Sequence, residues 1–221
     1  CSGCHLKDGR GRPPKNFDEP MKAMVVRLSI PGVAGDGGPL PHPNYGTQLQ
    51  DKGILGVPKE GRARIVYEEL AGVFGDGEPY SLRAPIYQFS EMSHGPLGAE
   101  VLYSGRVAPA THGLGLLEAV DEGLIISRAD PEDLDGDGIS GRVNWVWDPV
   151  AQKRALGRFG WKASVVSLYQ QVAGAAVADM GITTSVFPTQ NCLPAQSACL
   201  SAPDGGAPEL DDARLAKLVL Y

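Results

Sequence analysis

The chain opens with CSGCHLKDGRGRPP (residues 1–14), in which two cysteines and a histidine form the pattern C-x-x-C-H. This spacing is typical of covalent c-type haem attachment. Cys1 and Cys4 lie on one side of a helical turn, so both thiols can form thioethers to the two vinyl groups of the porphyrin. His5 then falls beneath the iron and ligates it. The opening stretch therefore predicts a haem protein whose haem-binding residues are Cys1, Cys4 and His5.

Three other interpretations of these cysteines remain open. A redox dithiol normally lies in a βαβ pattern, which the surrounding sequence lacks. A zinc site needs a second closely spaced pair, and Cys192 and Cys199 are seven positions apart. Acylation of Cys1, as in a lipoprotein, would withdraw that thiol from haem. Neither a dithiol nor a lipid anchor requires a histidine directly after Cys4, and this favours haem.

Glycine and proline are unusually frequent, with 29 and 18 residues among 221. Together they make up about a fifth of the chain, against about an eighth in an average protein. The composition therefore predicts many turns and few long regular elements. The net charge of -6 and the lack of a Lys/Arg stripe argue against a nucleic-acid-binding protein. The sequence contains no run of about 18 apolar residues, which is the length that would predict a transmembrane helix.

Hydrophobic periodicity predicts short elements distributed along the chain. Strand-like patterns occur at 24–30 and 143–149, and a hairpin is expected from 63–70 and 75–85. Helical patterns occur at 113–122, 161–181 and 208–221. Gly181 is suited to end the second of these helices.

A second cysteine pair lies in NCLPAQSAC (residues 191–199). The short, proline-containing loop between Cys192 and Cys199 suits a local disulfide; two free buried thiols are the alternative. A disulfide and covalent haem both belong to an oxidising compartment. The sequence therefore predicts a periplasmic or extracellular protein.

The stretch DLDGDGISGRVN (residues 133–144) resembles the first half of a calcium loop. Carboxylates at alternate positions can aim at one point, and Gly138 permits the sharp turn that follows. The expected ligands are Asp133, Asp135, Asp137, the carbonyl of Ile139, and Asn144 in place of the usual glutamate. A calcium site in the weaker, extracellular range is therefore predicted. The alternative is an Asp/Gly-rich surface turn without an ion.

The sixth coordination position of the iron decides the role of a haem. A protein ligand there favours electron transfer, whereas an open position admits a substrate. Met180 is the first candidate, because it ends the best helical pattern and precedes a glycine. A methionine in such a place is more often core filler. The other candidates are Met24, Met92, His94 and His112. His42, flanked by prolines, is expected to be exposed.

Several longer phrases carry a resemblance to a known family. They include RVAPATHGLGLLEAV (106–120), ADPEDLDGDGISGRVN (129–144), LGRFGWKAS (156–164) and QQVAGAAVADMGIT (170–183). With the opening motif, they resemble the di-haem oxidoreductase family of secreted bacterial proteins, also labelled thiol oxidoreductases. That family is distantly similar to the bacterial di-haem cytochrome c peroxidases.

The resemblance implies a cytochrome c-like haem domain with a large insert, mainly α-helical, with much irregular structure and a few short strands. Only one C-x-x-C-H is present, so residues 1–221 are expected to hold the first haem domain and the segment between the haems, without the second haem domain. The implied function is electron transfer with a donor or acceptor protein, as part of a peroxidase. A pure electron carrier and a calcium-stabilised extracellular binding module are the alternatives.

Overall fold

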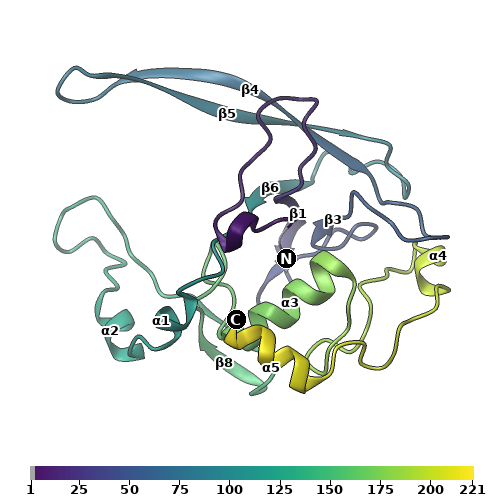
Figure 1. Cartoon of the computed structure of the whole chain (residues 1–221). Coiled ribbons are helices and arrows are strands. Elements are labelled where there is room, and N and C mark those ends of the chain that lie inside the picture. Colours follow the sequence, from purple (N-terminus) through teal and green to yellow (C-terminus); the bar gives the residue numbers. More distant parts are fainter. Residues whose placement is uncertain (1–2) are drawn as a thin grey trace. The chain divides into compact units, whose positions relative to one another are not determined.

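The computed structural model describes residues 3–221 and divides into two compact units (Figure 1). Unit 1 consists of the residues up to Pro31 with Pro41–Ala110 and Leu193–Ala202. Unit 2 consists of Gly32–Leu40, Thr111–Cys192 and Pro203–Tyr221. The expectation of a mainly α-helical fold is wrong, because 18% of the chain is helical and 28% lies in strands of several antiparallel sheets. Alternating β-branched and aromatic residues in the first half of the chain favour strands over helices.

The central sheet is built around β1 (Met24–Val33). It pairs antiparallel with β3 (Gln48–Leu49) and with β6 (Leu102–Val107), and β2 (Pro39–Leu40) is its fourth strand. Val26 and Leu28 point to one face and are buried, whereas Arg27 between them is exposed. This alternation is what buries one face of the sheet in the core of unit 1.

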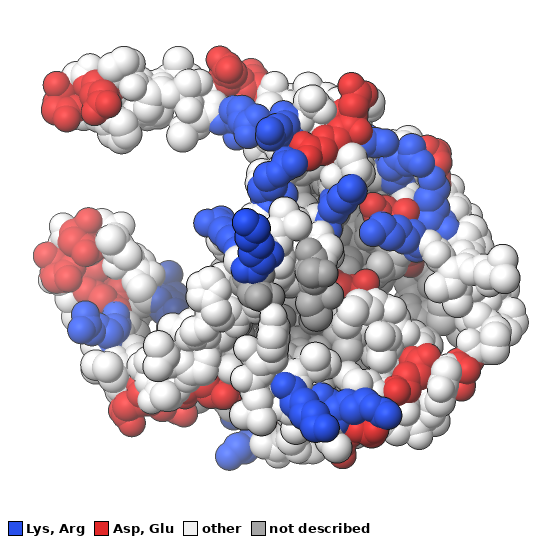
Figure 2. Space-filling model, viewed as in Figure 1, with Lys and Arg blue, Asp and Glu red and all other residues white. Residues whose placement is uncertain are grey.

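A long hairpin extends from unit 1 (Figure 1). Its strands β4 (Arg62–Val73) and β5 (Pro79–Ser90) pair in register along all twelve residues of each. The expected hairpin is therefore confirmed, although both strands run further than the sequence suggested. Pro85 does not interrupt β5, because an edge strand can spare one N–H group. Figure 2 shows acidic side chains at the tip, where the turn contains Asp76 and Glu78.

The core of unit 1 gathers Val26, Leu28, Tyr45, Leu49 and Ala63. Tyr45 is 1% exposed, and its hydroxyl donates to the Gly95 carbonyl at 2.5 Å. His42 packs against the Tyr45 ring and is itself only 4% exposed. The expectation that His42 is exposed is therefore wrong. Its ring takes part in hydrogen bonds with the Leu97 carbonyl and the Asn44 amide, which satisfy both nitrogens away from water.

Glu60 is a buried acid in the same unit. Its carboxylate accepts hydrogen bonds from the Gln50 amide at 2.8 Å and from the Gln196 side chain at 2.5 Å. Burial raises the pKa of Glu60 above its ordinary value of 4.5, while these two hydrogen bonds oppose the rise. Gln196 also donates to the Asn44 carbonyl, so the segment 193–202 is held to the core through one buried side chain.

The raised pKa of Glu60 predicts a pH dependence of stability. The folded chain holds this proton more tightly than the unfolded chain, so the stabilisation is fully present below pH 4.5 and is lost as pH rises through the folded-state pKa. Denaturation measured from pH 4.5 upward should show a falling free energy of unfolding, and Glu60→Gln should remove this part of the slope. Glu91→Gln is the control. The hydrogen bond from Lys59 lowers the pKa of Glu91, so the contribution of Glu91 to the free energy of unfolding changes only below pH 4.5. An unchanged slope in Glu60→Gln would contradict the prediction.

Unit 2 contains the longest helix, α3 (Leu168–Met180), packed against α5 (Asp212–Leu220). Ala173, Ala176 and Leu215 are fully buried in this unit. The Ser167 side chain caps the N-terminus of α3, and Gly181 ends the helix with φ 64°, as the sequence predicted. The unit also contains α1 (Leu114–Glu118), α2 (Glu122–Ser127), β7 (Trp145–Asp148) and β8 (Lys153–Leu156).

The helix predicted at 161–181 begins later, at Leu168. Phe159 and Val165 form an isolated bridge, and Gly160 and Ala163 between them have positive φ angles of 77° and 46°. These angles close a tight loop that a helix cannot continue through. None of the helices in the described part of the chain combines the length and the hydrophobicity of a membrane-spanning segment.

Candidate haem-attachment site and acidic loop

The opening motif is followed by a single 3-10 turn, η1 (Leu6–Asp8). Cys1 lies outside the described residues. Cys4 is a free, exposed thiol, and His5 is half-buried beside it. Cys192 and Cys199 are both disulfide-bonded, as the sequence predicted. Among the described residues, the accessible thiol therefore lies in the opening motif, next to an imidazole.

The His5 ring is fixed by one long-range hydrogen bond. Its Nδ1 lies 2.7 Å from the carbonyl oxygen of Pro109. A carbonyl only accepts, so Nδ1 carries the proton and donates it. In the neutral ring this arrangement leaves the lone pair on Nε2, which has no hydrogen-bond partner among the described residues. A metal-ligating histidine commonly has this arrangement, with one nitrogen held by a carbonyl and the other available to a metal.

The main chain around Gly11 holds the motif in place. The Gly11 amide donates to the Ala108 carbonyl at 2.9 Å, and the Ala108 amide donates to the Ala23 carbonyl at the same distance. A Cβ atom on Gly11 would lie 2.7 Å from the Ala23 Cβ and 2.9 Å from the Cys4 carbonyl oxygen. The motif therefore packs against residues 108–109 and Ala23 with no space for a side chain at position 11.

The loop after the motif is closed by Glu19. Its carboxylate accepts two hydrogen bonds from the Arg12 guanidinium, the longer at 3.0 Å, and one from the Lys15 amide at 2.6 Å. The hydrogen bond from Arg12, followed by that from the Lys15 amide, lowers the pKa of Glu19 from 4.5 to about 2. Glu19 therefore stays ionised, and the loop stays closed, well into acidic solution.

The same loop is attached to the β4–β5 hairpin. Three hairpin side chains donate to its main-chain carbonyls: Tyr67 to Pro14 at 2.7 Å, Arg64 to Asp18 at 2.9 Å and Arg83 to Lys15 at 3.3 Å. No pattern in the sequence indicates these contacts, since each joins residues more than 40 positions apart. They make the hairpin part of the frame that positions the haem motif.

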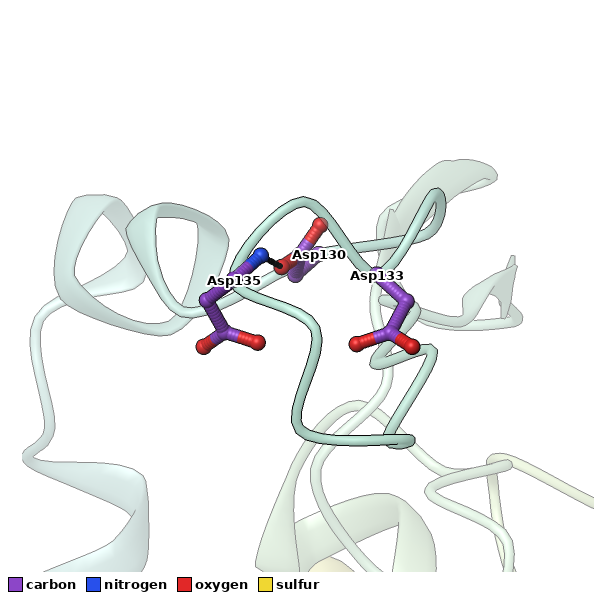
Figure 3. Close-up of side chains that lie close together, drawn as sticks. All are labelled: Asp130, Asp133 and Asp135. Atoms are coloured by element: carbon purple, nitrogen blue, oxygen red, sulfur yellow. Dashed lines mark hydrogen bonds between the residues drawn. The ribbon is translucent and has the colours of Figure 1, made fainter.

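The acidic loop of unit 2 gathers three carboxylates (Figure 3). One oxygen from each of Asp130, Asp133 and Asp135 lies within 4.8 Å of the other two. The Asp130 carboxylate accepts from the Leu134 and Asp135 amides, and the Asp133 carboxylate accepts from the Gly138 amide at 3.1 Å. Figure 2 shows the acidic side chains clustered on this loop. The arrangement offers a cation several oxygen ligands of the kind that calcium prefers.

The predicted calcium ligands are only partly brought together. Asp133 and Asp135 belong to the group, and Asp130, which the sequence analysis missed, joins them. Its signal was its acidic side chain three positions before Asp133. Asp137 accepts instead from the Ile139 amide at 2.8 Å. The Ile139 carbonyl accepts from the Gly141 amide, and the Asn144 amide group donates to the Lys162 and Ala163 carbonyls.

A comparison with known protein families shows which family this chain belongs to. The family described as "Di-haem oxidoreductase, putative peroxidase" matches residues 1–197. The chain belongs to this family. No curated protein matches the chain, and no solved structure does. The match to the family confirms the relationship that the sequence phrases suggested.

The residues of this di-haem oxidoreductase fit the group that the family name implies. Cys4 offers an unpaired, accessible thiol, and His5 offers an imidazole whose Nε2 is free in the described structure. This donor set suits an iron porphyrin attached through a thioether and ligated by nitrogen. Cys4 and His5 lie in one segment. The closed loop 12–19 and the contacts of Gly11 hold this segment in place.

The candidates for a sixth iron ligand are distributed over both units. Met180 ends α3 in unit 2 and is 50% exposed, while His5 belongs to unit 1, so its role as a ligand stays a prediction. In unit 1, Met92 packs against the core, and the Met24 methyl group lies over Gly105. The remaining candidates are His94 in unit 1, near the Tyr45 ring, and His112 in unit 2.

Proposed function

We propose that this di-haem oxidoreductase chain carries a covalent c-type haem through which it exchanges electrons with a partner protein, as part of a peroxidase. The observation that carries the proposal is the 2.7 Å contact between His5 Nδ1 and the Pro109 carbonyl. Cys1 and Cys4 would hold the porphyrin by thioethers, and His5 Nε2 would ligate the iron. The haem, when bound, supplies the one-electron chemistry.

The protein residues contribute orientation and electronic tuning. The Pro109 carbonyl keeps the proton on Nδ1, sets the plane of the imidazole and increases the basicity of Nε2. The Arg12–Glu19 ion pair and the hairpin contacts fix the loop that follows, so that the motif keeps one geometry. Restricting this segment lowers the reorganisation that accompanies a change in the charge of the iron.

The proposal includes an oxidising compartment, periplasmic or extracellular. A disulfide at Cys192 and Cys199 persists in such compartments and is rare where thiols are kept reduced. Thioether attachment of haem through Cys1 and Cys4 belongs to the same environment, because both thiols must be delivered to the haem under controlled redox conditions.

The test counts covalent haems on the exported, matured chain. A pyridine haemochrome spectrum with intact mass should show one covalent haem, and Cys4→Ser should shift the haemochrome band because one vinyl group is left unreacted. His5→Ala should retain the covalent haem but lose the ligand spectrum of the wild type. A wild-type chain without covalent haem overturns the proposal. With haem present, peroxide-dependent oxidation of a reduced cytochrome supports the peroxidase, and its absence assigns a pure electron carrier.

We also propose that the acidic loop binds calcium, with Asp130, Asp133 and Asp135 as ligands. The support is the approach of three carboxylates that repel one another unless a cation lies between them. Titration calorimetry should give a dissociation constant of roughly 0.1–1 mM, the range of extracellular calcium modules.

Two variants decide which carboxylates hold the ion. Asp133→Asn should weaken calcium binding about tenfold or more, because a charged ligand is lost. Asp137→Asn is the matched control and should leave binding near the wild-type value, since Asp137 lies outside the group. If both variants lost calcium affinity equally, Asp137 would also be a ligand, as the calcium-loop spacing predicts. If the wild-type chain did not bind calcium, the proposed site would be refuted.

A further inference from the structure

An open cavity of about 420 Å³ lies in unit 1, between the segment after the haem motif and the middle of the hairpin. Its wall includes Pro13 from that segment and Val107, two residues before the Pro109 that holds His5. The volume is within the range of roughly 300–1,000 Å³ that is typical of small-molecule sites. Among the described lining residues, only Met24 was named above in connection with haem or calcium, as a candidate sixth ligand of the iron.

One part of the wall is apolar and aromatic. A Cβ atom on Gly105 would lie 2.0 Å from both the Met24 methyl group and the Tyr87 hydroxyl, so these two side chains occupy the space over the glycine. Burial raises the pKa of Tyr87, which keeps its phenol neutral. Tyr67 adds a second ring. Thioether and aromatic side chains of this kind contact flat ring systems favourably.

The other part of the wall carries a cation. Arg83 is the one charged side chain among the described residues of the lining. Its guanidinium lies over the Tyr67 ring, 4.3 Å from the centroid, and uses one N–H group on the Lys15 carbonyl. Glu69 faces it across the hairpin, but the two form no ion pair among the described residues. The planar fork of an arginine with spare N–H groups matches a carboxylate.

We infer that this cavity binds the carboxylate-bearing edge of a planar aromatic group. Arg83 holds the carboxylate, and Met24, Tyr67 and Tyr87 contact the ring. Two sources share this chemistry: the propionate edge of the chain's own haem, or a free aromatic acid that enters from solution. The first source rests on the proposed function, whereas the second does not.

The first measurement is calorimetric titration of the full, matured chain with 2-naphthoate, with 2-naphthylmethanol as the uncharged probe. If the cavity takes a free acid, naphthoate binds saturably and the alcohol binds more weakly. Arg83→Gln should weaken naphthoate binding about tenfold or more, as expected for the loss of a charge-assisted hydrogen bond. Arg62→Gln is the matched control, because Arg62 lies on the other face of the hairpin, beside Glu91 at 3.3 Å.

The second measurement is the midpoint potential of the haem in the same variants. If the haem edge fills the cavity, naphthoate does not bind, but Arg83→Gln makes the potential more negative, because a cation near the haem favours its reduced form. Arg62→Gln leaves the potential unchanged. The inference is overturned if Arg83→Gln alters neither naphthoate binding nor the potential, or if both probes bind equally well. A chain without covalent haem refutes the proposed function, yet the naphthoate titration still decides whether the cavity binds a free acid.

Discussion

Gly11→Ala is expected to destabilise unit 1 and to reduce the fraction of chains that carry haem. The added methyl group would lie 2.7 Å from the Ala23 Cβ and 2.9 Å from the Cys4 carbonyl oxygen, and neither neighbour is the end of a flexible side chain. Overpacking of this kind costs about 1–3 kcal/mol. It exceeds the roughly 0.4–1 kcal/mol that alanine gains over glycine through the unfolded chain. Chemical denaturation and haem stoichiometry measure the two effects.

Gly3→Ala provides the matched control for this substitution. It makes the same chemical change in the same segment, but a Cβ atom on Gly3 has no neighbour within 4 Å among the residues that the structure describes. We expect its stability and haem content to stay close to those of the wild type. If Gly11→Ala behaved like Gly3→Ala, the close packing of the motif against Ala23 would be refuted.

Leu215→Ala is expected to lower the stability of unit 2 strongly, and more than Leu220→Ala does. Leu215 is fully buried on α5, the helix that packs against α3. Removing a buried leucine side chain costs about 2–5 kcal/mol, since transfer energy is lost and a cavity remains. Urea denaturation followed by circular dichroism should show the loss. Leu220→Ala on the same helix is the control, because Leu220 is 87% exposed. Equal midpoints for the two variants would contradict the assignment of Leu215 to the core.

Several local patterns predicted local structures correctly, although the helix expected at 161–181 begins only at Leu168. The alternation over 63–85 predicted the hairpin, because its cross-strand neighbours are set by a single turn. The disulfide-bonded pair and the Gly181 stop of α3 are also short-range features. In each case the residues that decide the structure lie within one element or one turn, and a single sequence contains that information.

Features that depend on distant residues were missed. The Pro109 carbonyl holds His5 from 104 positions away, and no spacing rule connects the two. His42 was expected to be exposed from its flanking prolines, yet the Leu97 carbonyl and the Tyr45 ring bury it. The helical fold class came from resemblance to cytochrome domains and overlooked how much of unit 1 is strand. Asp130 was missed because the calcium-loop spacing begins at Asp133.

The division of the chain into interleaved segments has a consequence for biosynthesis. The Gln196 side chain that completes the surroundings of Glu60 is translated 136 positions later. At 5–20 residues per second, this delay is roughly 7–27 s. During that interval, the Glu60 carboxylate of the nascent polypeptide lacks its Gln196 hydrogen-bond partner. Unit 1 therefore acquires its final interior only when the segment Leu193–Ala202 emerges, long after the opening motif has been made.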